Sequence, residues 1–110
     1  MTRPRIVCLC GSTRFKDTFD SANLLETLAG NIVLSIGCCL RSDNELWADP
    51  VEREKIKEQL DELHLRKIDL ADEVLILNVD RYIGPSTQRE LVYAITHNKV
   101  VRYWEPMDNE

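Results

Sequence analysis

Glu90 is the residue whose type and setting most favour chemistry. It follows a turn rich in glycine, proline and hydroxyl side chains, in the segment YIGPSTQRELVYA (residues 82–94). A carboxylate beside a bound sugar can act as a nucleophile or a general base. A structural role fits as well, because Thr87-x-x-Glu90 has the spacing of a capping box, in which the glutamate bonds back to the first N–H groups of a helix. The two roles require different directions of the Glu90 side chain, and the local sequence leaves both open.

Two short segments carry residue types that hold a phosphate. Residues 11–14 read Gly-Ser-Thr-Arg after an apolar run, and residues 84–87 read Gly-Pro-Ser-Thr before another. Free N–H groups at a helix start bind anions, and hydroxyl and guanidinium groups add donors. Neither segment has the P-loop or the dinucleotide-binding pattern. The substrate-binding candidates in and beside these segments are Gly11, Ser12, Thr13, Arg14, Tyr82, Gly84, Ser86 and Thr87.

Further polar residues fall near the same elements. His64 lies on the apolar stripe of a predicted helix with Leu60 and Ile68, so it is either a hydrogen-bonded core residue or a catalytic partner of Glu90. Asn78 comes directly at the end of a predicted strand, where a ligand is expected. By contrast, the segment from Lys67 to Asp72 is predicted to lie at the opposite edge of the sheet. Other polar residues predicted near the ligand edge are Asp43, Asn44, Asp49 and Asp80.

The four cysteines form two pairs. Cys8 and Cys10 alternate in an apolar run, so they share one face of a strand and are interpreted as small hydrophobic residues. Cys38 and Cys39 are adjacent, which is the wrong spacing for a zinc site and strained for a disulfide. We therefore expect no metal and no cofactor.

The elements that position these residues alternate between strand and helix. Short apolar runs predict strands, and periodic apolar positions predict helices. The predicted strands cover residues 5–10, 31–37, 73–79 and 99–104, and the helices cover residues 12–29, 49–70 and 87–97. Ser12 or Thr13 is expected to cap the first helix, and Asp49 before Pro50 the second. The second helix is expected to face inward with Ile56, Leu60, Leu63, Ile68 and Ala71.

This alternation predicts the fold class. It indicates an α/β domain with a Rossmann-like or flavodoxin-like parallel sheet of about four to five strands and helices on both faces. Residues 1–105 are expected to form one domain, and residues 106–110 a polar C-terminal tail. In such a sheet, ligands bind at the carboxyl ends of the strands. Three loops are therefore expected at that edge, namely the loop with Ser12, the segment 37–48 and the loop with Tyr82.

Composition excludes several classes of partner. The chain has 110 residues and a formal net charge of −5, without a run of lysine and arginine, so nucleic acid is not expected as a partner. No apolar run is long enough for a membrane span. We expect a cytoplasmic protein with a small-molecule ligand. Because four parallel strands leave exposed edges, a homodimer or larger homo-oligomer is expected as well.

Taken together, the segments VCLCGSTRF, IVLSIG, LADEVLILNVD and GPSTQRELVYAITHNKVVRYW resemble the nucleoside 2-deoxyribosyltransferase superfamily. The likeness covers nearly the whole chain and is closest to the small nucleoside-monophosphate N-glycosidase branch. It implies an enzyme that acts on a nucleotide or nucleoside, with Glu90 as the nucleophile. It also implies that Ser12, Arg14, Ser86 and Thr87 hold phosphate or ribose, and that Tyr82 contacts the base.

The sequence departs from the family pattern at three positions. Gly84 stands where the transferases carry an aspartate, which favours the phosphate-binding branch. His64 stands where the family has an aspartate that helps to protonate the departing base, with Asp61 one turn earlier. The family's E-x-G is Glu90-Leu91-Val92 here, so the close approach that glycine allows is lost. The alternative is therefore a nucleotide-binding module of the same fold that does not cleave its ligand.

Overall fold

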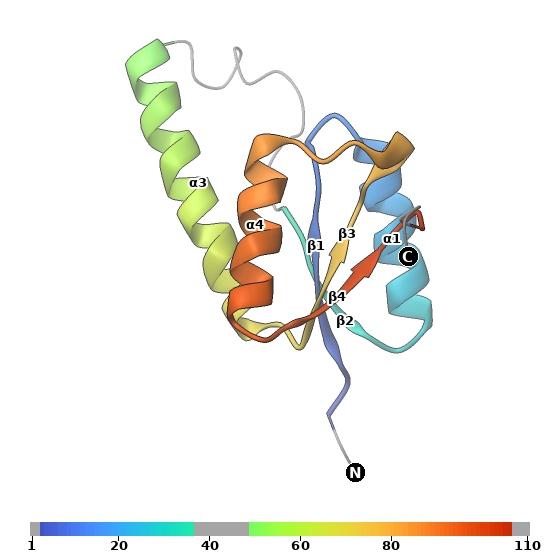
Figure 1. The fold of residues 1–110 in the computed structure, drawn as a ribbon. Helices are drawn as coiled ribbons and strands as arrows, with labels where there is room; N and C mark the ends of the chain where they lie inside the picture. Colours follow the sequence, from blue (N-terminus) through green and yellow to red (C-terminus); the bar gives the residue numbers. More distant parts are fainter. Residues whose placement is uncertain (1–2, 37–48, 107–110) are drawn as a thin grey trace.

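Strands and helices alternate along the chain in the computed structural model, which describes residues 3–36 and 49–106 (Figure 1). The elements are β1 (Ile6–Cys10), α1 (Lys16–Leu28), β2 (Ile32–Leu34), α3 (Pro50–Leu70), β3 (Glu73–Ile76), the 3-10 turn η1 (Val79–Arg81), α4 (Pro85–Thr96) and β4 (Val100–Tyr103). The predictions for Cys38, Cys39, Asp43, Asn44 and the last four residues lie outside the described part.

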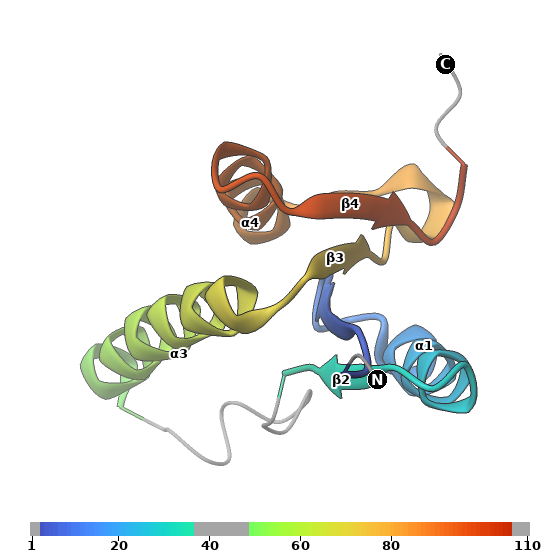
Figure 2. The same cartoon turned by 90° about the horizontal axis from the view of Figure 1, so that it is seen from below.

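The four strands form one sheet in the order β2-β1-β3-β4, and every pairing is parallel. The predicted α/β class with a Rossmann-like or flavodoxin-like parallel sheet is thus confirmed. Helix α1 covers one face of the sheet, and α3 with α4 covers the other (Figure 2). β2 and β4 remain at the edges, and the homo-oligomer stays a prediction. Among the described residues, no helix is long and apolar enough to cross a membrane.

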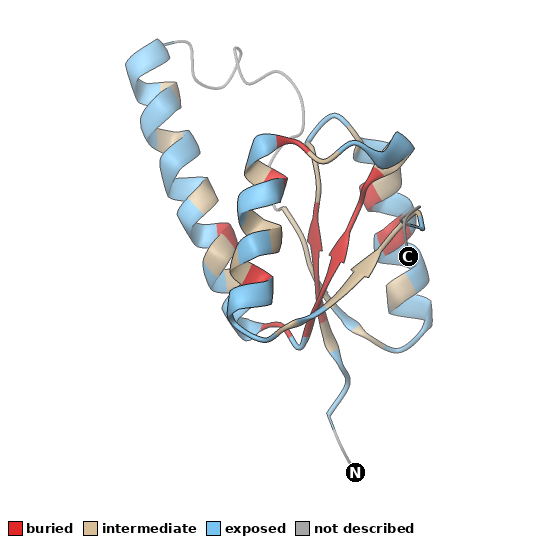
Figure 3. Cartoon of the chain, viewed as in Figure 1, coloured by how far each residue is buried: buried red, intermediate tan, exposed pale blue. Residues whose placement is uncertain are grey.

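Each face of the sheet has its own core, and burial concentrates in β1 and β3 (Figure 3). Val7 and Leu9 of β1 point toward α1, where they pack near Phe19. Cys8 and Cys10 point to the other face, toward Ile68 and the neighbouring residues of α3 and α4. This alternation is what places the two cysteines on one face, as predicted.

Helix α3 is much longer than the strands that it covers. Its 21 residues span about 31 Å, whereas the five residues of β1 span about 16 Å. Only the second half therefore packs on the sheet, with His64 and Ile68 buried. The prediction that Leu60 and Leu63 face the core is wrong, because they are 37% and 50% exposed. Asp49 caps the helix as predicted, accepting a hydrogen bond from the Val51 N–H at 3.1 Å.

Two predicted helix starts are also wrong. Helix α1 begins at Lys16 and not at Ser12, because the chain first makes a turn in which the Phe15 N–H bonds the Ser12 carbonyl at 3.1 Å. Helix α4 begins at Pro85 and not at Thr87, with Gly84 as the N-cap residue. Proline suits the first helical position, because its missing N–H has no partner there in any case.

The end of α1 at Leu28 lies next to the predicted boundary at residue 29. Gly30 takes a left-handed conformation with φ of +91°, and its N–H bonds the Thr27 carbonyl. The next N–H, of Asn31, bonds the Glu26 carbonyl, which completes a Schellman motif. The turn directs the chain into β2.

Asp72, directly before β3, forms hydrogen bonds with the start of β1 and the residues before it. Its carboxylate accepts two hydrogen bonds from Arg3, both at 2.9 Å, and one from the Ile6 N–H at 2.8 Å. The bonds from Arg3, followed by the bond from Ile6, lower the pKa of Asp72 from 3.8 to about 2. The pKa in the folded state is thus below that of the unfolded chain. The carboxylate therefore stabilises the fold above about pH 4, and this contribution is lost as the pH falls toward 2.

The Asp72→Asn variant is expected to show this dependence. Near neutral pH it should unfold at a lower urea concentration than the wild type, because the charged partner of Arg3 is gone. The gap between the two urea midpoints should shrink as the pH is lowered, since the wild-type carboxylate becomes protonated as well. A gap that stays constant across the acid range would contradict this role of Asp72.

Candidate functional site

A cavity of about 480 Å³ opens at the carboxyl ends of the strands, between α3 and the start of α4. Its volume is in the range of small-molecule sites. The loop after β1, the first half of α3 and the turn into α4 all contribute to its wall. It is lined by Gly11, Ser12, Thr13, Ile36, Arg53, Ile56, Lys57, Leu60, Asp61, Leu63, His64, Lys67, Tyr82, Gly84, Pro85, Ser86, Thr87 and Glu90.

The cavity brings together nine of the eleven residues predicted for the site. Arg14 and Asn78 are missing from the described lining. Arg14 lies over the Tyr82 ring, with 4.5 Å from its guanidinium carbon to the ring centroid. Asn78 is buried and holds the end of β4, because its amide donates to the Glu105 carbonyl at 3.0 Å and accepts from the Glu105 N–H at 2.9 Å. Its position therefore serves the fold and not the cavity.

Glu90 points into this cavity. It lies in the second turn of α4, so it cannot reach back to the helix start, and the predicted capping box with Thr87 is wrong. One carboxylate oxygen, Oε1, lies 4.0 Å from His64 Nε2, and the side chain is only 13% exposed. Burial raises the pKa of Glu90, and the charge of His64 opposes this rise only in part.

His64 lies next to Glu90 and contacts polar groups of β1. Its Nε2 lies 3.1 Å from the Leu9 carbonyl, 3.4 Å from Cys10 Sγ and 3.6 Å from Cys8 Sγ. Burial lowers the pKa of His64, but the hydrogen bond with Cys8 and the charges of Cys8 and Glu90 outweigh burial, so the pKa is raised. Between the two thiols, their mutual hydrogen bond lowers the pKa of Cys8 and raises that of Cys10. The interpretation of His64 as a hydrogen-bonded core residue is thus confirmed, and its ring also reaches the cavity.

Helix α3 supplies the residues that the sequence interpretation missed. Arg53, Lys57 and Lys67 bring positive charge to the wall, and Ile56, Leu60 and Leu63 bring apolar surface. Lys67 had been expected at the opposite edge, but its Nζ donates to the Ser35 carbonyl at 2.6 Å, beyond the end of β2. Positions 53, 57, 60, 64 and 67 follow a helical spacing, which is the signal that could have identified this face.

Gly11 allows the loop after β1 to lie close to Leu77. A Cβ atom at this position would lie 3.0 Å from the Cβ of Leu77 and 3.3 Å from the Leu77 carbonyl oxygen. On the other side of the cavity, Gly84 packs against the Tyr82 ring in the same close manner. A side chain at either position would therefore require its neighbour to shift.

A larger hollow of about 960 Å³ lies at the opposite end of the sheet. Its wall includes Arg5, Glu26, Glu73 and Arg102, and these side chains already pair with one another. Such a network of satisfied ion pairs explains the polar wall without a ligand. We therefore place the candidate site at the carboxyl edge, where Glu90 faces open space.

No family model matches the chain, and no curated protein matches it significantly. The resemblance to the nucleoside 2-deoxyribosyltransferase superfamily thus stays a hypothesis. The residues of the cavity therefore carry the functional conclusion.

Proposed function

We propose that this protein cleaves or transfers the N-glycosidic bond of a nucleotide or nucleoside, with Glu90 as the nucleophile. The observation that carries the proposal is the direction of the Glu90 carboxylate, which lines the cavity and takes no part in helix capping. A carboxylate placed in this way can approach the anomeric carbon of a bound sugar. The sequence resemblance to an N-glycosidase family supports the same chemistry.

The surroundings of the cavity suit a 5′-phosphate. The N–H groups of Ser86 and Thr87 belong to the first turn of α4, where a helix attracts anions. Arg53 and Lys57 add positive charge from α3, and Lys57 pairs with Asp61 on the same wall at 3.1 Å, a partner that a phosphate would have to replace. A chain with a net charge of −5 thus gathers Arg53, Lys57 and Lys67 on the wall that also carries Asp61 and Glu90. The ligand that fits this combination is a nucleoside monophosphate.

The reaction would proceed in two steps. A Glu90 oxygen attacks the anomeric carbon, the bond from that carbon to the base nitrogen breaks, and the base leaves with its electron pair and takes up a proton. Water, or a second base, then attacks the same carbon and releases Glu90, as in retaining glycosidases. The residues that could supply the proton are His64, at 4.0 Å from Glu90, and Asp61 on the cavity wall.

Release of free base from a panel of nucleosides and nucleoside monophosphates tests the proposal. We expect turnover of at least one monophosphate and a higher KM for the matching nucleoside, which lacks the phosphate. In the Lys57→Gln variant, the KM for the monophosphate should rise by roughly 10- to 150-fold, since a charge-assisted contact contributes roughly 1.5–3 kcal/mol. The KM for the nucleoside should not change.

Lys55→Gln is the matched control, because Lys55 is exposed on the same helix and does not line the cavity. It should leave both KM values unchanged. Equal effects of Lys57→Gln on the nucleoside and the monophosphate would contradict the assignment of this wall to phosphate.

The second candidate function is nucleotide binding without cleavage. The observation in its favour is the position of His64, whose Nε2 is directed at the Leu9 carbonyl and the two sulfur atoms and not at the open cavity. An acid held in this way is poorly placed to protonate a departing base. A nucleotide that raises the melting temperature without any release of base would favour this candidate.

A further inference from the structure

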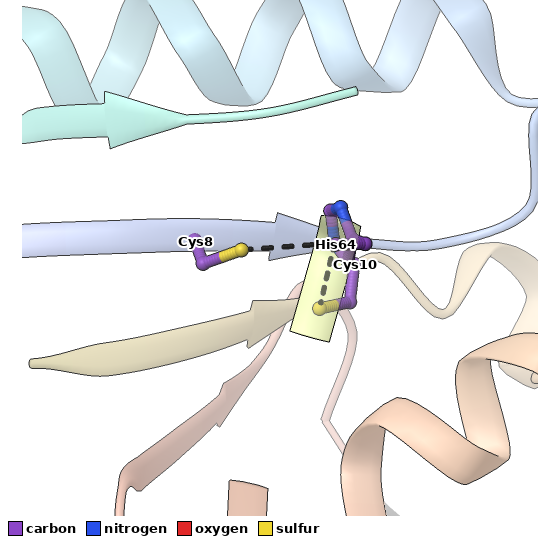
Figure 4. Close-up of side chains that lie close together, drawn as sticks. All are labelled: Cys8, Cys10 and His64. Atoms are coloured by element: carbon purple, nitrogen blue, oxygen red, sulfur yellow. Dashed lines mark hydrogen bonds between the residues drawn. The ribbon is translucent and has the colours of Figure 1, made fainter. Parts of the chain in front are cut away.

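Cys8, Cys10 and His64 form a cluster beneath the cavity that the proposed reaction does not explain. Two thiols from β1 and one imidazole from α3 converge on a common point (Figure 4). The two cysteines are fully buried and His64 is 5% exposed. The three ligand atoms, two Sγ and one imidazole nitrogen, all lie within 4.8 Å of one another.

The spacing of these atoms fits a tetrahedral metal site. Zinc binds thiolate sulfur at about 2.3 Å and imidazole nitrogen at about 2.0 Å, so a sulfur and a nitrogen on the same ion lie about 3.5 Å apart. The observed separations from His64 Nε2 are 3.6 Å to Cys8 Sγ and 3.4 Å to Cys10 Sγ. An ion could therefore enter between the three groups with little movement of the backbone.

A fourth ligand is available beside the cluster. Glu90 Oε1 lies 4.0 Å from His64 Nε2. An oxygen and a nitrogen on one zinc ion lie about 3.4 Å apart, so a small rotation of the Glu90 side chain would complete the shell. The cavity itself is the route of access, because both His64 and Glu90 line it.

The chemistry of the donors selects the kind of ion. Two thiols and an imidazole favour zinc or a similar borderline-soft transition metal over magnesium or calcium, which prefer oxygen ligands. We propose that Cys8, Cys10 and His64 bind one zinc-class ion, with Glu90 as the fourth ligand. Binding displaces the two thiol protons and the proton that His64 Nε2 shares with the Leu9 carbonyl. The metal site does not rest on the proposed nucleotide function, and a bound ion would compete with the substrate for Glu90.

Cobalt titration of the full-length chain under reducing conditions tests the proposal. After treatment with a chelator, we expect Co²⁺ to produce a thiolate-to-cobalt charge-transfer band and the strong visible bands of a tetrahedral site, saturating at one ion per chain. Zinc should abolish both sets of bands. Cys8→Ser and Cys10→Ser should each weaken zinc binding more than about 100-fold, which exceeds the usual effect of losing a group outside the metal's direct ligands. Glu90→Gln should retain the charge-transfer band and change the visible bands.

The other cysteine pair supplies the matched control. The Cys38→Ser/Cys39→Ser double variant should bind cobalt and zinc like the wild type, since the proposed ligands are Cys8, Cys10, His64 and Glu90. If the double variant loses the charge-transfer band, or if no band forms in the wild type, the proposal is wrong.

A measurement on the wild-type chain avoids any variant that fails to fold. Zinc should slow the alkylation of Cys8 and Cys10 and leave the alkylation rate of Cys38 and Cys39 unchanged. Mass spectrometry of the peptides would measure these rates. Equal rates at Cys8 and Cys10 with and without zinc would overturn the proposal.

Discussion

Replacing Glu90 by glutamine is expected to reduce the release of free base by roughly 10⁴-fold or more, the size of loss seen when a nucleophile or its partner is removed. The amide has nearly the same shape as the carboxylate but cannot form the glycosyl ester. Because Glu90 lines the cavity and does not cap α4, the substitution should act on kcat with a much smaller effect on KM. Steady-state kinetics on the best monophosphate of the panel would measure both constants.

The same variant should fold normally. Burial raises the pKa of Glu90, which means that the folded chain disfavours the charged carboxylate. Removing that charge should leave the melting temperature unchanged or raise it. Glu58→Gln is the matched control, because Glu58 is exposed on α3 and lies outside the cavity lining; it should keep full activity. Full activity in Glu90→Gln would show that Glu90 is not the nucleophile.

The double variant Arg5→Met/Arg102→Met is expected to lose about 3–5 kcal/mol of the free energy of unfolding, because it leaves a buried charge unpaired. The charge belongs to Glu73, whose side chain is 2% exposed at the start of the central strand β3. In the wild type, Arg5 donates to Glu73 at 2.8 Å, and Arg102 pairs with the other carboxylate oxygen. Chemical denaturation would measure the loss.

Adding Glu73→Leu to the double variant should restore most of the lost stability, since an apolar group of similar size can replace a buried ion pair. The control is Lys16→Met, which removes an exposed pair with Asp20 and should change stability by less than about 1 kcal/mol. If the triple variant is no more stable than the double variant, the buried charge is not the cause of the loss.

The sequence predicted the sheet and its helices because their signals are local. Gly30 with its left-handed conformation, Asp49 before Pro50 and the alternation of Cys8 and Cys10 each depend on a few neighbouring residues. The strand boundaries were less accurate. Residues 77–79 were predicted as strand because they are apolar enough, but β3 ends at Ile76 and the chain turns into η1.

The candidate site was predicted where it depends on the sheet edge, and missed where it depends on the length of α3. Gly11, Ser86 and Glu90 follow strands in a parallel sheet, so their meeting could be expected. Lys57 and Leu60 line the cavity because α3 extends past the strands, a consequence of the predicted element lengths that was not drawn. The error at Thr87 arose because two residues, Gly84 and Thr87, each fit a helix start, and the proline between them decides in favour of Gly84.

Gly11 and Gly30 differ in the substitutions that they tolerate. At Gly30 only the left-handed backbone matters, since a side chain there would meet nothing within 4 Å, and asparagine is a ready substitute. At Gly11 any side chain would press on Leu77, so even alanine would push apart β1 and the segment after β3. A lineage of this protein could therefore change at position 30 and keep its cavity, whereas a side chain at position 11 requires the backbone that carries Leu77 to shift.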